Sequence, residues 1–182
     1  TANIKPQTSQ QIAAGLAKSI GPFEFSVEGY YKTMDNLVSY KEGASFLFSL
    51  DNDTWEDKIS QGSGESYGME FFAQRKTGRT TGWIGYTLSW SYRQFDDING
   101  GERYFFTYDR RHDISVVASH DFTDNISFSG AWVYGTGRAV TLPEYSYYTG
   151  LPDGLSWWDG ARVLVDRPSD KNAYRMSPYH RL

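Results

Sequence analysis

Strict alternation of apolar and polar residues is the feature that most constrains this chain. In the stretch GPFEFSVEGYYK, an extended backbone separates an apolar from a polar set of side chains, namely Phe23, Phe25, Val27, Gly29 and Tyr31 against Glu24, Ser26, Glu28, Tyr30 and Lys32. A soluble sheet would turn the apolar set toward a core, whereas a membrane barrel would turn it toward lipid. The stretch therefore predicts a strand but does not decide what its apolar face contacts.

The same period of two recurs along the chain, and no segment keeps the period of a helix. The alternating segments predict six strands, at residues 8–20, 21–34, 66–75, 83–93, 112–122 and 125–135. We therefore expect an all-β, antiparallel, up-and-down arrangement that occupies residues 1–182 as one partial domain.

The connections between these segments alternate in length. Gly21–Pro22, 76–82 and 121–125 are short, whereas 35–64, 94–109 and 137–178 are long. In an antiparallel meander, odd and even connections lie at opposite ends of the sheet. Outer-membrane barrels have short periplasmic turns and long extracellular loops, so this asymmetry favours a section of a transmembrane β-barrel over a soluble sandwich.

Three segments that rise from the short-turn end have apolar faces of similar length. Each climbs on the order of 20 Å at a typical strand tilt, close to the roughly 25 Å apolar band of such barrels. Aromatic residues near the tops of these faces predict a lipid-facing girdle, formed by Tyr31, Trp90, Tyr92, Trp132 and Tyr134. The carboxylates of Glu24, Glu28 and Glu70 are expected to face the interior of the barrel.

Composition excludes several other classes. The formal net charge is -4 with no basic stripe, which gives no electrostatic footprint for nucleic acid. The absence of cysteine removes disulfide scaffolds, zinc fingers and thiol catalysis. No apolar run is long enough for a membrane helix. We predict no metal, no cofactor and no enzymatic activity.

Six strands are too few for this kind of barrel, since single-chain outer-membrane barrels need at least about eight. An isolated open sheet would also expose two long edges. Residues 1–15 carry neither the basic start nor the apolar stretch of a signal peptide. We therefore expect the sequence to be a section of a longer protein, with a further strand beginning near SPYHRL.

Five motifs resemble TonB-dependent outer-membrane receptors and occur in that family's order. They are IKPQTSQQIAAGL, GSGESYGMEF, TTGWIGYTLSWSYR, YDRRHDISVVASHDF and WVYGTGRAVTLP, of which the last two look most like receptors of the Bacteroidetes type. Gln7 and Ile12 or Ala13 depart from the acidic residues usual in the first motif. Together the motifs cover nearly the whole chain.

The resemblance implies the C-terminal part of a 22-stranded barrel in the bacterial outer membrane. It also implies an N-terminal plug domain and TonB as partners, both outside this sequence, with a surface lipoprotein as a candidate partner. Such a receptor imports a scarce nutrient, for example a siderophore, a glycan or a peptide. A fragment without plug and final strands is not expected to transport anything.

Aromatic side chains in the long connections are the candidate ligand-binding residues, since rings can stack on sugars or on flat organic chelates. They are Tyr104, Phe106, Tyr108, Trp157 and Trp158. An outer-membrane enzyme is a second alternative, because the segment YDRRHD gathers carboxylates and His112. Asp113 follows His112 directly on a strand, which places the two side chains on opposite faces, so a solvated, salt-bridged rim is the expectation for this segment.

A soluble carbohydrate-binding β-sandwich is the main rival. In a sandwich, Phe25, Leu88 and Phe128 would be fully shielded by protein, whereas in a membrane barrel they would point away from it. The acidic stretches DNDTWED and DDINGGE do not follow the spacing of an EF-hand and are read as solvated turns.

Overall fold

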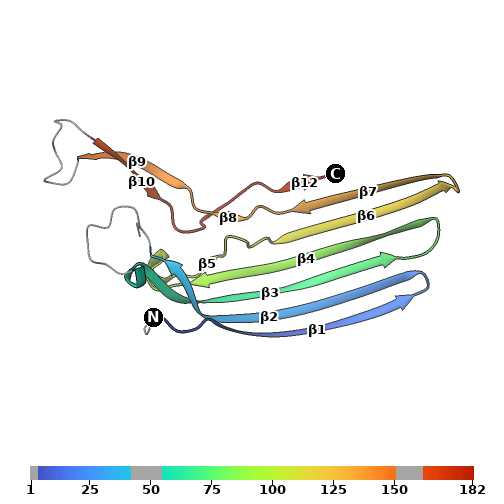
Figure 1. The fold of residues 1–182 in the computed structure, drawn as a ribbon, viewed down its shortest axis with the longest axis horizontal. Coiled ribbons are helices and arrows are strands. Elements are labelled where there is room, and N and C mark those ends of the chain that lie inside the picture. Colours follow the sequence, from blue (N-terminus) through green and yellow to red (C-terminus); the bar gives the residue numbers. More distant parts are fainter. Residues whose placement is uncertain (1–3, 42–54, 151–161) are drawn as a thin grey trace.

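The computed structural model describes residues 4–41, 55–150 and 162–182, and the fold is all-β (Figure 1). Its longest strands are β1 (Thr8–Ile20), β2 (Phe23–Tyr40), β3 (Ile59–Arg75), β4 (Thr80–Gln94), β6 (His112–Thr123) and β7 (Ile126–Gly135). Within these described residues there are also two short 3-10 helices, η1 (Trp55–Lys58) and η2 (Asn99–Gly101). None of the described helices is long and apolar enough to cross a membrane.

The long strands form one antiparallel sheet in the order β1-β2-β3-β4-β6-β7. All six predicted strands are confirmed, and β1 has the predicted bounds. β2 and β3 extend farther than predicted, to Tyr40 and from Ile59, with a bulge between Met34 and Leu37. The connection expected at 35–64 is therefore shorter than the sequence indicated.

The short turns all lie at one end of the sheet, on the right in Figure 1, and we call this the turn end. Gly21 has φ +58 in the two-residue turn between Ile20 and Phe23, a conformation that glycine adopts at no steric cost. The strand ends from which the long connections leave, such as those of β2 and β3, lie at the opposite end, which we call the loop end (Figure 1). The predicted asymmetry between the two ends is therefore present in the fold.

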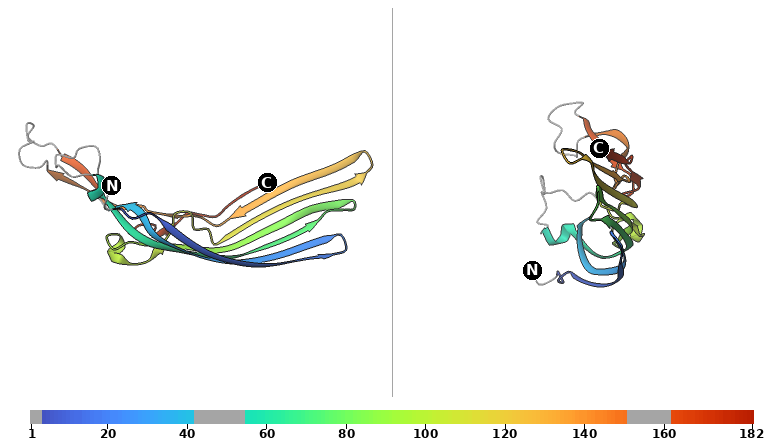
Figure 2. Two further views of the ribbon diagram at one scale, coloured as in Figure 1. Left: turned by 60° about the horizontal axis from the view of Figure 1, so that its bottom comes forward. Right: turned by 90° about the vertical axis from the view of Figure 1, so that its right-hand side faces the viewer.

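The sheet is curved and open. Figure 2 shows the curvature in a view along the strands. Within the described residues β1 pairs only with β2, and β12 (Tyr179–Arg181) pairs only with β7, so these two strands are the edges. β12 is the further strand expected near the end of the sequence.

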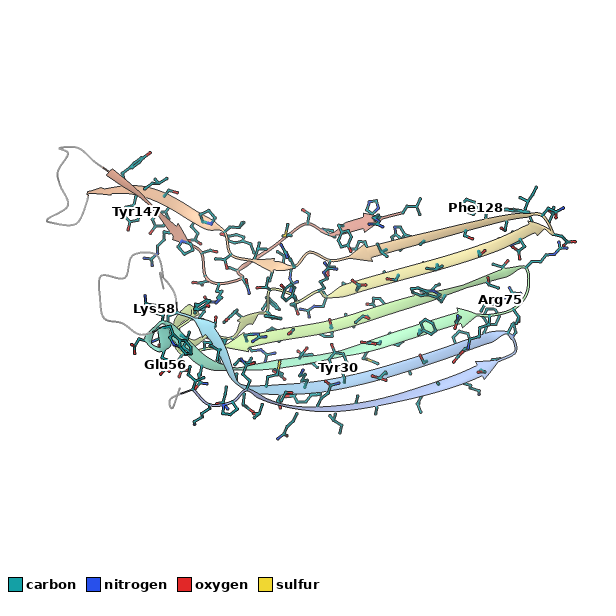
Figure 3. The ribbon with its side chains drawn as sticks, in the orientation of Figure 1. Tyr30, Glu56, Lys58, Arg75, Phe128 and Tyr147 are labelled. Carbon is teal, nitrogen blue, oxygen red and sulfur yellow. The ribbon has the colours of Figure 1, made fainter. Side chains whose placement is uncertain are left out.

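The connection after β7 is more structured than the sequence indicated, since residues 137–178 were expected to form a loop. β8 (Ala139–Val140) pairs with β11 (Tyr174–Arg175), and β9 (Pro143–Gly150) pairs with β10 (Arg162–Pro168). The β9–β10 hairpin extends beyond the sheet at the loop end, where Figure 3 labels Tyr147. β5 (Tyr104–Phe105) adds a short pairing to β4.

The buried apolar core is small and lies at the loop end. It consists of Leu37, Phe95, Ile98 and Tyr104, with Met34 packed against it. Cross-strand pairing places Met34, Gly64, Arg93 and Tyr104 in one row, and this row belongs to the polar face of the sheet. Phe95 and Ile98, at the start of the connection after β4, therefore pack over the polar face.

Candidate functional site

The apolar side chains of the long strands gather on one face of the sheet, because direct cross-strand partners share a face. One row contains Leu16, Val27, Phe71, Tyr86, Ile114 and Tyr134, and the next contains Lys18, Phe25, Ala73, Ile84, Val116 and Trp132. Lys18 is the charged exception in these rows. The alternation of each strand thus adds up to a continuous apolar surface.

No second sheet covers this surface in the described part of the chain. Phe25 is 42% exposed and Phe128, labelled in Figure 3, is 67% exposed, while Leu88 is only half-buried. The side chains leave a shallow apolar hollow of about 720 Å³, bordered by Leu16, Phe25, Phe71 and Ile84 among others. The dry core that a sandwich requires at these positions is not formed by the described residues.

The predicted girdle residues all lie on the apolar face but in two groups. Tyr31, Tyr67 and Trp90 are direct neighbours across β2, β3 and β4, with ring centroids 6.4 Å and 5.3 Å apart. Trp132 and Tyr134 stack on each other at 6.1 Å in rows closer to the turn end. Tyr67 was not among the predicted girdle residues, although its alternation phase placed it on this face.

Tyr92 belongs to the first group and lies where the apolar face reaches the loop end. Its ring stacks on Phe105 at 5.0 Å, and the Arg103 guanidinium lies 3.6 Å from its ring centroid. Arg103 also forms an ion pair of 2.8 Å with Glu65. The apolar face therefore ends in a band of aromatic and charged side chains at the loop end.

The predicted interior carboxylates share the opposite, polar face. Glu28 and Glu70 are direct cross-strand partners and both are exposed, while Glu24 pairs with Lys76. Two like charges directly opposite each other oppose pairing unless water screens them. This face is therefore suited to water and not to a hydrocarbon environment.

Asp109 is the most buried charged side chain described at the loop end. Its carboxylate is fully enclosed, pairs with Arg175, and lies 3.6 Å from Nη2 of Arg111. Oδ1 also accepts a hydrogen bond of 2.6 Å from the backbone N–H of Ser91. The expectation of a solvated, salt-bridged rim is wrong for Asp109, because these donors replace water.

This carboxylate fills a break in the sheet. β4 pairs with β5 and then with β6, and residues 106–111 leave the ladder between them. Phe106 N–H still donates to Ser91 O at 2.9 Å, and Ser89 N–H donates to Arg111 O at 3.2 Å. Asp109 satisfies the Ser91 N–H that lies between these two bonds, so a side chain substitutes for a backbone carbonyl.

Residues 169–175 connect several loop-end elements, and we call them the clamp segment. Asn172 has φ +59 and its side-chain amide donates to Phe105 O at 2.8 Å. Lys171 N–H donates to Asn99 Oδ1 at 2.7 Å, and its ammonium donates to Ser39 Oγ at 2.8 Å. The clamp segment thus holds β2, η2 and β5 together, which no local pattern in the sequence indicated.

The predicted loop aromatics do not form one exposed patch. Tyr104 is buried in the small core, whereas Tyr108 is 71% exposed. Phe106 is half-buried, and its ring packs edge-on against the ring of Tyr108 with the two centroids 5.3 Å apart. Trp157 and Trp158 lie outside the described residues.

Tyr104 and Phe106 line a loop-end cavity of about 340 Å³ on the polar face. Arg93 and Lys171 also line it, together with Ser39 and Thr107. The Arg93 guanidinium lies 4.0 Å from the Phe106 ring centroid, and its Nε is enclosed without a hydrogen-bond partner among the described residues. Sequence reasoning missed Arg93, whose phase in β4 placed it on the polar face.

His112 and Asp113 lie on opposite faces, as their adjacency on a strand predicted. His112 pairs with Leu88 on the apolar face and bonds to Tyr86 Oη at 2.8 Å, whereas Asp113 pairs with Thr87 on the polar face. The two groups cannot act together on one bond.

Comparisons of the chain with protein-family models, with curated proteins and with solved structures find no match.

Proposed function

We propose that this chain is part of the wall of a TonB-dependent type of outer-membrane β-barrel, which binds a nutrient at its extracellular end and imports it. The single observation that carries the proposal is the apolar face, which runs across all the long strands and which no second sheet covers in the described part of the chain. Apolar patches of this size on soluble monomers are rare and mark surfaces that meet a partner or a membrane. Acyl chains are the partner that fits a continuous face with shallow apolar hollows.

Three further features support the proposal. The opposite face carries Glu28 and Glu70, whose facing charges require water. The turn end has short turns and the loop end has long connections, as outer-membrane barrels have. The sequence motifs resemble TonB-dependent receptors. On that resemblance we assign TonB as the source of energy and a scarce nutrient as the cargo.

The proposal assigns no covalent chemistry to the chain. Binding and passage require a polar interior, a closed wall and recognition groups at the extracellular end. The curved sheet would supply the wall once further strands pair with the edges β1 and β12. The loop-end cavity and the exposed Tyr108 would lie where cargo arrives.

Single cysteines test the orientation, because the chain contains no cysteine of its own. In intact Gram-negative cells, a membrane-impermeant maleimide should label Tyr108→Cys at the loop end. Asp124→Cys, in the turn between β6 and β7, should react only after the outer membrane is permeabilised. Equal labelling of both positions in intact cells, or labelling of neither before permeabilisation, would contradict the proposal.

A further inference from the structure

The loop-end cavity has an unusual charge. Two cations, Arg93 and Lys171, line it, and no carboxylate does so among the described residues. The nearby arginines differ, since Arg111 and Arg175 share the buried Asp109. Arg93 is therefore a cation of the lining that meets no carboxylate among the described residues.

Arg93 is the cation of this cavity whose charge no described residue balances. Its side chain is half-buried against Phe106, and it forms no ion pair with a described residue. Its Nε is enclosed and lacks a hydrogen-bond partner there. A half-buried guanidinium with an enclosed, unbonded Nε and no opposite charge is costly, and an anion that bonds to the guanidinium lowers that cost.

The lining also defines what kind of anion fits. A guanidinium is planar and presents paired N–H donors, which match the two oxygens of a carboxylate or a phosphate. Phe106 and Tyr104 provide an apolar wall next to it. The hydroxyls of Ser39, which accepts from the Lys171 ammonium, and of Thr107, which accepts from the Asn172 amide, make the rest of the lining polar. A volume of about 340 Å³ is at the small end of ligand pockets, enough for one acidic arm with an attached ring or short chain.

We propose that the loop-end cavity binds the oxyanion group of an organic substrate, a carboxylate or a phosphate, on Arg93. This inference rests on the proposed function, since it places the site on the water-facing side of the wall at the extracellular end. It narrows the substrate class to molecules with an acidic group next to an apolar part. Neutral sugars would not use this site.

Small probes test the proposal on the full chain purified in detergent. Benzoate and phenyl phosphate carry the two oxyanions, and benzamide is the neutral control of the same shape. We expect saturation-transfer NMR to detect at least one charged probe and to show binding at least about tenfold weaker for benzamide, because a hydrogen bond to a charged group is lost. The stronger of the two charged probes identifies the oxyanion.

Matched variants locate the binding. Arg93→Gln should weaken the charged probe by about tenfold or more, whereas Arg103→Gln removes the same charge outside the cavity and should leave affinity unchanged. Arg93→Lys keeps the charge and loses the planar fork, so it should weaken binding by a smaller factor and carries the test if Arg93→Gln does not fold.

Two results would overturn the inference. One is equal binding of benzamide and the charged probes, and the other is equal loss in the Arg93 and Arg103 variants, which would indicate general attraction to positive charge. Labelling of Tyr108→Cys in intact cells does not depend on Arg93. The probe experiment can therefore contradict the oxyanion site without contradicting the proposed orientation, and the labelling experiment can contradict the orientation without contradicting the oxyanion site.

Discussion

The turn end and the loop end of the same sheet are stabilised in different ways. At the turn end, the strands are joined by backbone ladders, and large side chains such as Phe128 and Ile126 remain exposed. At the loop end, Phe95 and Ile98 are fully buried and Asp109 is enclosed by cations. The loop end thus supplies its own interior, whereas the turn end leaves its apolar face for something outside the described chain.

This difference predicts where substitutions act. Side chains at the loop end hold elements that are far apart in sequence, so their loss should change the free energy of unfolding strongly. Side chains at the turn end should matter through their environment and less through contacts within the chain.

The largest effect is expected for Asp109→Ala. It leaves Arg175 and Arg111 without their shared carboxylate and removes the acceptor of the Ser91 N–H. Removing one partner of a buried ion pair costs about 3–5 kcal/mol. Denaturant titration followed by tryptophan fluorescence would measure the loss in the free energy of unfolding.

Asp113→Asn is the matched control for Asp109→Ala. Asp113 forms a 3.5 Å ion pair with Arg110, and both side chains are well exposed. Exposed ion pairs contribute about 0–1 kcal/mol to the free energy of unfolding. Similar losses for the two variants would mean that burial at the loop end does not set the strength of these pairs.

A smaller effect is expected for Gly62→Ala. A Cβ at this position would lie closest to the backbone oxygen of Gln94 and 2.5 Å from Phe95 Cδ1, so the backbone of β4 and the small core would have to shift, at a cost of about 1–3 kcal/mol. At Gly130, on the apolar face of β7, the nearest atom is Phe128 Cε1 at 3.8 Å, and Gly130→Ala should be neutral or slightly stabilising. Thermal melting of both variants checks this, and a neutral Gly62→Ala would contradict the packing described at the loop end.

The sequence was a good guide to the turn end because alternation is a local signal. The bounds of β1 and the face assigned to each residue of β4 follow from period two and from turns such as Gly21–Pro22. Tyr67 was on the predicted face, and only its membership of an aromatic row required the register between strands.

The loop end was less predictable because its contacts join distant positions. Asp109 is paired with Arg175, and Asn172 bonds to Phe105, and no spacing in the sequence connects these residues. Tyr104 was expected to be exposed but is buried, because its row on the polar face is covered by the connection that follows β4. Gly62 and Gly64, on one face of β3, were the available signal that bulky groups approach there.

The central claim is that the apolar face of the sheet meets lipid and the polar face meets water. Ser115 and Val116 are adjacent in β6 and lie on opposite faces, so single cysteines at these positions, labelled with a polarity-sensitive fluorophore in bilayers, compare the two environments directly. We expect doxyl lipids to quench the label at Val116→Cys and iodide to quench the label at Ser115→Cys. Iodide quenching at both positions, or protection of Val116→Cys from both quenchers, would contradict the claim.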